Sequence, residues 1–214
     1  DPSTSSGRMH PYFLAEAIND AIPEDAIVVL DGGEAPAWVD LLIAAERPYS
    51  VLRLGYLGTL GVGQGYAIGA ARAHPGRPIV LVTGDGSVAF HISEFDTMAR
   101  HDMPVATIVF NNMSWAMSVH GQQVVSGDRG VVASRLADSS YEMVARAFGG
   151  DGERVDQLED MPAAMQRALA SQVPYCINAA VDPEVVHPIT IAMLGDTTAT
   201  DAIVVPYYEN LPIA

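Results

Sequence analysis

Short apolar runs alternate along the chain with segments whose apolar residues recur at the spacing of an amphipathic helix. The runs predict strands at residues 26–30, 50–54, 78–83, 104–110 and 175–181, with a short extended piece near 154–155. The periodic segments predict helices at residues 11–21, 36–45, 61–73, 93–100, 139–148 and 161–171. Runs without polar positions indicate strands that are buried on both faces. Their alternation with helices predicts an α/β fold, a mainly parallel sheet with helices on both faces.

Composition fits a single folded domain and excludes several classes of partner. Of 214 residues, 49% are hydrophobic and 17% are charged, which supplies enough apolar surface for a core. The formal net charge is −15, and all 11 basic residues are arginines scattered along the chain. We therefore expect no nucleic-acid partner and no membrane partner. The single cysteine, Cys176, lies in a predicted strand, where a core role is expected, and it favours a reducing, cytoplasmic location.

The ends of the chain differ in pattern from its middle. Residues 1–7 are rich in Ser, Thr and Pro and are expected to form a linker or tail. We expect the domain to occupy residues 8–194 and a C-terminal tail to occupy residues 195–214. Residues 182–214 show little periodicity and predict no regular layer. The acidic run 151–160 is expected to be a solvated surface.

Polar residues follow two of the predicted strands at the point where each ends. Asp85 lies in Gly84-Asp85-Gly86-Ser87 after strand 78–83, and Asn111-Asn112 follows strand 104–110. Asn112 lies 27 positions after Asp85, one strand–helix–strand unit later. Because the carboxyl ends of parallel strands share one edge, a carboxylate and an amide oxygen should lie side by side there. Mg²⁺ prefers such oxygen ligands, and the N–H groups of the glycine turn can hold a diphosphate.

Two other interpretations of these turns were weighed against the metal–diphosphate site. A GDGS sequence alone is typical of an ordinary strand-to-helix turn, and the double asparagine makes the functional interpretation specific. A dinucleotide-binding site needs G-x-G-x-x-G after the first strand, whereas Asp31-Gly32-Gly33-Glu34 has the glycines without that spacing. The sequence therefore favours a metal-bridged diphosphate site.

The GDG and NN segments together resemble the thiamine-diphosphate motif. Further segments resemble benzaldehyde lyases, within the wider group of acetolactate-synthase-like enzymes, over about residues 8–194. These segments are 55–63, 82–88, 94–97, 111–115, 120–123, 147–149 and 176–178. The resemblance implies the C-terminal, diphosphate-binding domain of the thiamine-diphosphate-binding fold. It also implies thiamine diphosphate and Mg²⁺ as cofactors.

The resemblance implies a role for individual residues of this chain. Asp85 and Asn112 would bind Mg²⁺ through side-chain oxygens, and Ser114 would bind it through its backbone carbonyl. Gly58 and Leu60 would lie by the aminopyrimidine, with Leu60 supporting the bent shape of the cofactor. The full set of implied cofactor-binding residues is Gly33, Glu34, Gly58, Thr59, Leu60, Gly84, Gly86, Ser87, Ser114, Trp115, Ala116 and Met117.

The catalytic residue that the resemblance implies does not lie in this sequence. In the family, a glutamate on a separate pyrimidine-binding domain activates the cofactor, and Glu34, Glu94 and Glu142 do not match its position. We therefore expect the chain to be a piece of a longer enzyme or one subunit of a split enzyme. Its expected partners are a pyrimidine-binding domain, a small carbonyl substrate and further copies in a homo-oligomer.

The resemblance implies a thiamine-diphosphate-dependent carbon–carbon lyase or carboligase acting on 2-hydroxy ketones or aldehydes. Alternatives are a 2-keto acid decarboxylase, an acetolactate-synthase-like enzyme with the same cofactor, and a non-catalytic subunit. Leu54, Met117 and Gly121 replace a histidine, an alanine and a phenylalanine that border the substrate in benzaldehyde lyases. These replacements favour aliphatic 2-hydroxy ketones or 2-keto acids over aromatic aldehydes. Of the six histidines, His120 is expected to approach the site most closely.

Overall fold

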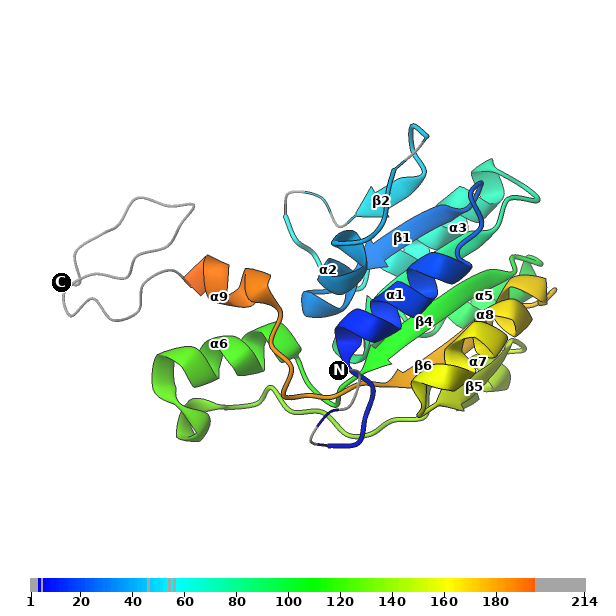
Figure 1. The fold of residues 1–214 in the computed structure, drawn as a ribbon. Coiled ribbons are helices and arrows are strands. Elements are labelled where there is room, and N and C mark those ends of the chain that lie inside the picture. Colours follow the sequence, from blue (N-terminus) through cyan, green and yellow to red (C-terminus); the bar gives the residue numbers. More distant parts are fainter. Residues whose placement is uncertain (1–3, 5, 46, 54, 56, 195–214) are drawn as a thin grey trace.

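A computed structural model describes residues 4, 6–45, 47–53, 55 and 57–194, which form one parallel sheet covered by helices (Figure 1). The six strands lie in the order β2-β1-β3-β4-β6-β5, and every neighbouring pair is parallel. Their bounds are β1 Ile27–Asp31, β2 Val51–Arg53, β3 Ile79–Gly84, β4 Val105–Asn111, β5 Asp151–Val155 and β6 Tyr175–Ala180. The strand order reverses between β1 and β3, which is the place where such sheets bind ligands.

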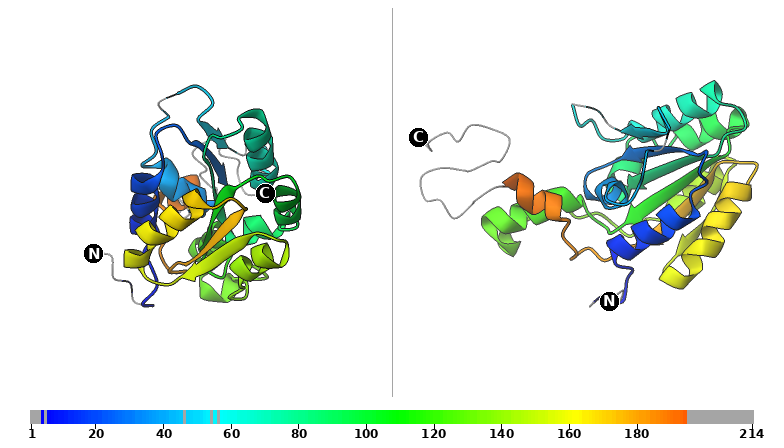
Figure 2. Two further views of the ribbon diagram at one scale, coloured as in Figure 1. Left: turned by 90° about the vertical axis from the view of Figure 1, so that its right-hand side faces the viewer. Right: turned by 45° about the horizontal axis from the view of Figure 1, so that its top comes forward.

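Helices cover both faces of the sheet. One layer consists of α1 (Pro11–Ala21), α2 (Glu34–Asp40) and α8 (Met161–Ala170), and the other of α3 (Gly63–Ala73), α5 (Glu94–Arg100) and α7 (Tyr141–Ala147). Two short 3₁₀ helices span Asp128–Gly130 and Leu158–Asp160. Two further helices, α6 (Ala116–Ser126) and α9 (Pro188–Leu194), extend beyond the sheet on the side where β4 ends (Figures 1 and 2).

Alternate residues of the central strands enter different cores. Val28 and Val80 pack in the core under α1 and α8, whereas Val29 and Leu81 pack in the core under α3 and α5. This arrangement confirms the expectation of strands buried on both faces, and it confirms the predicted α/β fold. Cys176 is fully buried in the second core, as expected from its strand.

The predicted helices and strands of the sheet are present, but some bounds differ. The helix predicted at 36–45 begins at Glu34 and ends at Asp40. Its early start is possible because proline is tolerated throughout the first turn of a helix, and Pro36 lies there. The helix predicted at 61–73 begins at Gly63 because Gly61 has a left-handed backbone, with φ +83°.

Several regular elements were not predicted, or were predicted only in part. The helices α6 and α9 were not predicted, and α9 is one short helix, beyond the sheet, within the segment where no regular layer was expected. The acidic run 151–160 was expected to be a solvated surface, but its first half is β5, in which Gly152 and Val155 are buried. Pairing with β6 holds this polar segment in the sheet, and the two residues that it buries, Gly152 and Val155, lie on opposite faces of the strand.

The chain ends are described in part. Thr4 Oγ1 donates to the carbonyl of Arg8, and Ser6 Oγ donates to Asp182 Oδ2 over 2.6 Å. The remaining residues of the expected linker, and the expected tail 195–214, lie outside the described residues. Within the described helices, none is long and apolar enough to cross a membrane.

Candidate cofactor site

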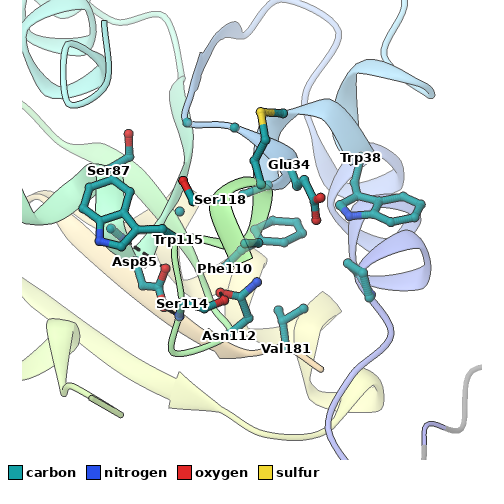
Figure 3. Close-up of a pocket in the computed structure, with 18 of the residues that line it drawn as sticks. Glu34, Trp38, Asp85, Ser87, Phe110, Asn112, Ser114, Trp115, Ser118 and Val181 are labelled. Atoms are coloured by element: carbon teal, nitrogen blue, oxygen red, sulfur yellow. Dashed lines mark hydrogen bonds between the residues drawn. The ribbon is translucent and has the colours of Figure 1, made fainter. Parts of the chain in front are cut away.

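A cavity of about 260 Å³ opens at the carboxyl ends of β1, β3 and β4, where the strand order reverses (Figure 3). It brings together thirteen of the fourteen residues for which the sequence implied a role in binding the metal or the cofactor. These are Gly33, Glu34, Gly58, Leu60, Gly84, Asp85, Gly86, Ser87, Asn112, Ser114, Trp115, Ala116 and Met117. Thr59 is not among the lining residues, and its side chain is exposed.

Asp85 is buried at the first position of the short helix α4 (Asp85–Ala89), directly after β3. Its Oδ1 accepts a hydrogen bond from the amide of Gly86 over 2.8 Å, and its Oδ2 accepts one from the amide of Ser114 over 3.1 Å. Burial raises the pKa of Asp85 to about 7, although these backbone donors oppose the shift. A divalent metal ion bound to this carboxylate would favour its ionised form.

Ser114 connects the ends of β3 and β4. Its amide contacts Asp85, and its Oγ donates to Asn112 Oδ1 over 3.0 Å, so both predicted ligand side chains lie around one residue. Figure 3 shows the Asp85, Ser114 and Asn112 side chains gathered on one side of the cavity. The intervening Met113 has a φ of +57°, and this turn lets the chain fold back toward Asp85.

Asn111 anchors this loop from behind. Its Oδ1 accepts from the amide of Met113 over 3.3 Å, and its Nδ2 donates to Asp138, Asn178 and the carbonyl of Ser139. The side chain is fully buried, so these bonds hold the loop in a water-free environment. The first asparagine of the NN pair therefore positions the loop, and the second points to the cavity.

The turn predicted to hold the diphosphate is packed against Trp115. A Cβ on Gly86 would lie 2.8 Å from Cε3 of the Trp115 ring, which is closer than atoms can approach. Glycine at this position therefore lets the indole lie against the first turn of α4. Residues 114–117, all four of which the resemblance implies as cofactor-binding, lead into α6, which begins at Ala116.

The hydroxyl of Ser87 does not point freely into the cavity. Its Oγ donates to Asp31 Oδ1 over 3.0 Å and accepts from the amide of Gly61 over 3.1 Å. The hydroxyl proton is therefore committed, and only the amide of Ser87 is suited to donate to a phosphate. Amides in the first turn of a helix have no carbonyl partner within that helix.

Asp31 is a site residue that sequence reasoning missed. It ends β1 fully buried, and its carboxylate accepts from the amides of Gly61 and Gly63 over 3.0 and 2.9 Å. These bonds, with that from Ser87, join the loop that carries Leu60 to the start of α4. The available signal was the position of Asp31 at the end of β1, since Asp85 likewise comes directly after the end of β3.

Glu34 lies at the cavity, whereas His120 and Gly121 are not among its lining residues. The Glu34 carboxylate lines the cavity but is bonded to His120 and Thr190, so it does not point freely at a ligand. His120 is buried and does not itself line the cavity, although it approaches through Glu34. Gly121 is also absent from the lining, and Leu54 lies outside the described residues.

The residues present fit a divalent cation. The charged side chains in the lining are all carboxylates, those of Glu34, Asp85 and Asp182, and no arginine or histidine lines the cavity over the described residues. Among the described residues, no group of three or more His, Cys, Asp or Glu side chains is placed to hold a metal ion. One carboxylate, one amide oxygen and a backbone carbonyl form a hard set suited to Mg²⁺, which completes its shell with water and phosphate oxygens. Without a basic side chain, a bound diphosphate depends on such an ion for charge compensation.

Residues 31–179 match the family described as thiamine pyrophosphate enzyme, C-terminal TPP binding domain. The chain belongs to this family. Thiamine pyrophosphate is another name for thiamine diphosphate, so the match confirms the cofactor class that the GDG and NN motifs indicated. The narrower resemblance to benzaldehyde lyases stays a prediction.

Relatives of this thiamine pyrophosphate domain include several named enzymes. A probable acetolactate synthase of Mycobacterium bovis is 35% identical over 180 residues, which cover 84% of this chain and 33% of the relative. A 2-hydroxyacyl-CoA lyase 2 of Caenorhabditis elegans is 36% identical over 153 residues, 72% of this chain and 24% of the relative. A sulfoacetaldehyde acetyltransferase of Castellaniella defragrans is 34% identical over 165 residues, 77% of this chain and 27% of the relative. The chain thus spans a quarter to a third of these relatives.

A solved structure shows the same fold. The thiamine diphosphate-dependent 4-hydroxybenzoylformate decarboxylase of Rhodococcus jostii RHA1 superposes with a TM-score of 0.76 at 23% identity. The superposition covers 85% of this chain and 34% of that one. The likeness supports the α/β architecture and carries no argument about the substrate.

Proposed function

We propose that this chain is the Mg²⁺- and diphosphate-binding domain of a thiamine-diphosphate-dependent carbon–carbon lyase or carboligase. The observation that carries the proposal is the connection of Asp85 and Asn112 through Ser114 at the mouth of a cavity without basic side chains. Asp85 Oδ, Asn112 Oδ1 and the Ser114 carbonyl hold the ion, which offsets the diphosphate charge. Bound thiamine diphosphate supplies a carbon nucleophile and an electron sink for carbonyl chemistry.

The chain's own residues hold and orient the cofactor. The amides at the start of α4 face the diphosphate, and Leu60 supports the pyrimidine side of the bent cofactor. Asp31 fixes the loop of Leu60 relative to Ser87, so that the two cofactor ends are held at a constant separation. Apolar side chains of Trp38, Phe110 and Val181 exclude water from the cavity.

Aliphatic 2-hydroxy ketones or aldehydes are the proposed substrates. Met117 occupies the space beside Gly33, with its Cβ 3.2 Å from the position that a Cβ on Gly33 would take. This side chain narrows the cavity at a position where benzaldehyde lyases carry alanine.

An acetolactate-synthase-like enzyme or a 2-keto acid decarboxylase is the second candidate. It is favoured by the 35% identity with the probable acetolactate synthase, which covers more of this chain than the match with the 2-hydroxyacyl-CoA lyase. The two candidates share the metal site and differ in whether the first substrate loses CO₂. If the chain were a non-catalytic subunit, it would not bind Mg²⁺ and thiamine diphosphate in a form that supports a reaction.

We propose further that a pyrimidine-binding domain supplies the activating glutamate. Leu57 and Phe90 are 86% and 58% exposed, and the Phe90 ring packs against the Trp115 ring in a tilted arrangement, with ring centroids 5.6 Å apart. An apolar rim beside the cavity supports the proposal that a pyrimidine-binding domain covers it, from this polypeptide or from another copy in a homo-oligomer.

Calorimetry with Mg²⁺ and thiamine diphosphate tests the proposal, first on this chain and then with the pyrimidine-binding domain added. We expect binding that requires both the ion and the diphosphate, and that is strengthened by the second domain. Assays of the assembled enzyme with benzoin, acetoin and pyruvate then separate the candidates. Acetoin cleavage supports the lyase, acetolactate formation from pyruvate supports the synthase, and benzoin cleavage contradicts the aliphatic assignment. Absence of thiamine diphosphate binding in the assembled enzyme contradicts the proposed function itself.

A further inference from the structure

A buried carboxylate and a buried imidazole face each other behind the cavity wall. His120 Nδ1 lies 2.9 Å from both Oε1 and Oε2 of Glu34, and its Nε2 lies 2.9 Å from the carbonyl oxygen of Pro183. The side chains are 1% and 2% exposed. Thr190 Oγ1 donates a further hydrogen bond to Glu34 Oε1.

The partners of His120 determine its protonation. A backbone carbonyl and a carboxylate accept hydrogen bonds and cannot donate them, so each ring nitrogen needs its own proton. A neutral imidazole has one N–H and would leave one of these two contacts without a hydrogen. The arrangement is therefore satisfied by an imidazolium and an ionised Glu34, which form a buried ion pair.

The charges around the pair agree with this assignment. Burial lowers the pKa of His120, but the hydrogen bond and charge of Glu34, the Pro183 carbonyl and the charge of Glu184 together hold it above its usual value. The other titratable group facing Glu34 is His187, whose pKa burial lowers, and its Nδ1 accepts from the amide of Ile189. The neutral His187 does not compete for the carboxylate charge.

The pair connects three segments that lie far apart in the sequence. Glu34 is the first residue of α2, His120 lies in α6, and Pro183 and Thr190 belong to the segment that leads into and forms α9. One turn before His120, Met117 packs against Gly33, the residue that precedes Glu34. Two adjacent contacts therefore fix α6 against the start of α2. Ala116, Met117 and Ser118, the first turn of α6, line the cavity.

We propose that Glu34 and a doubly protonated His120 form a positioning ion pair that holds the first turn of α6 in place as a wall of the cofactor cavity. Neither side chain of the pair contacts the proposed metal ligands. Neither has a free N–H group that could donate to a ligand in the cavity. It also removes Glu34 from any role as a free acid or base in the cavity. The consequence for cofactor affinity rests on the proposed function, whereas the protonation state and the anchoring of α6 do not.

The protonation state is tested by ¹⁵N NMR of the histidine side chains in the unliganded chain at pH 7.5. We expect both nitrogens of His120 to show protonated, imidazolium-type shifts. In Glu34→Gln, the glutamine amide can donate to Nδ1, and we expect one nitrogen to become unprotonated. An unprotonated nitrogen on His120 in the wild-type chain overturns the ion pair.

The positioning role is tested by hydrogen exchange and by the cofactor dependence of the assembled enzyme. In His120→Gln we expect faster amide exchange in α6, with an about 10-fold rise in the thiamine diphosphate concentration at half-maximal rate and little change in kcat at saturation. In Glu34→Gln/His120→Gln, which leaves no buried unpaired charge, we expect part of this loss to be recovered. The matched control, His74→Gln on the surface, should change neither readout.

The outcomes separate this inference from the proposed function. Unchanged α6 exchange in His120→Gln overturns the positioning role, even where the cofactor binds as proposed. A fall in kcat with unchanged cofactor dependence also overturns it, because that result indicates a catalytic or general structural effect. If the variant does not fold, the NMR assignment of the wild-type chain still decides whether the ion pair exists. Failure of the wild-type assembly to bind thiamine diphosphate refutes the proposed function and leaves the ion-pair result standing.

Discussion

The backbone amide of Ser114, just beyond β4, donates a hydrogen bond to the carboxylate of Asp85, just beyond β3. This hydrogen bond links the ends of two strands, through residues that are 29 positions apart in the sequence. Asn112 is added to the group through the hydroxyl of Ser114. The metal site proposed for this domain is therefore assembled by the parallel pairing of β3 with β4 before any ion is bound.

Replacement of Asp85 tests the ligand role without removing the side-chain volume. In Asp85→Asn we expect Mg²⁺-dependent thiamine diphosphate binding to weaken by at least about 100-fold, more than the loss of an outer-shell partner causes. The amide keeps an oxygen for the backbone donors but lacks the charge that holds the ion. Calorimetry measures the effect, and Asp96→Asn on the surface of α5 is the control. Wild-type affinity in Asp85→Asn would show that the ion binds elsewhere.

The raised pKa of Asp85, about 7, predicts how the affinity for Mg²⁺ depends on pH. The ion binds the ionised carboxylate, so below pH 7 it must displace a proton. We expect the apparent affinity to fall as pH drops from 7 to 5, by up to about tenfold per unit. Titrations at several pH values check this, and an affinity that is flat over this range contradicts the assignment.

The same pKa predicts the pH dependence of stability in the metal-free chain. The folded-state pKa is raised from 3.8 to about 7, so the favourable contribution of the protonated carboxyl is complete below pH 3.8 and is lost as pH rises through 7. Relative to Asp85→Asn, the free energy of unfolding of the wild-type chain should fall over this range by at most about 4 kcal/mol. Urea unfolding at pH 5 and pH 8 measures the difference, and added Mg²⁺ should reduce it.

Gly86→Ala tests the packing of Trp115 against the diphosphate turn. The new Cβ would lie 2.8 Å from the indole, so Trp115 must move, and we expect a destabilisation of about 1–3 kcal/mol. Fluorescence of Trp115, measured in a Trp38→Phe background, should shift with the displacement. The control is Gly69→Ala, because Gly69 lies in α3 with open space around it and should stabilise the chain by about 0.5–1 kcal/mol.

The clash in Gly86→Ala should be relieved by a second change. In Gly86→Ala/Trp115→Ala we expect the two effects on unfolding to be non-additive, since the crowded ring is gone. Strict additivity of the two changes would show that the indole is not the group that requires glycine at position 86.

Asp31→Asn tests the residue that holds the loop of Leu60. The amide keeps one acceptor oxygen but places N–H donors opposite an amide of Gly61 or Gly63, and we expect a loss of about 1–3 kcal/mol in the free energy of unfolding. Thiamine diphosphate affinity should fall while affinity for Mg²⁺ alone is retained. Asp20→Asn on the surface of α1 should stay within about 0.5 kcal/mol of wild type. Equal stability of the two variants would contradict the role of Asp31.

The sheet and its helices were predictable because burial on both faces produces apolar runs such as Ile79–Val82. The metal site was predictable because parallel strands place their carboxyl ends on one edge, so Asp85 and Asn112 had to approach. The helix α6 was not, because its sequence contains Gly121 and a weak apolar period, and packing of His120 on Glu34 stabilises it instead. The role of Asp31 was not predictable, because it accepts hydrogen bonds from residues of other loops. Which loops meet in the folded chain cannot be read from the spacing of residues in the sequence.

The hydrogen-bond partners of the polar side chains in the site also could not be predicted from the sequence. Ser87 and Glu34 were expected to face the cofactor, and both lie at the cavity, but their polar atoms are bonded to Asp31 and His120. A motif specifies which residues are near a ligand, whereas the competing protein partners determine which of their atoms remain available.

The most direct test of the metal site is a crystal structure of the chain with thiamine diphosphate and Mn²⁺ in place of Mg²⁺. The anomalous signal of Mn²⁺ locates the ion independently of any assumption about its ligands. We predict one strong peak in contact with Asp85 Oδ, Asn112 Oδ1, the Ser114 carbonyl and two diphosphate oxygens. A peak elsewhere, or a bound diphosphate with no ion between it and these three residues, would contradict the account.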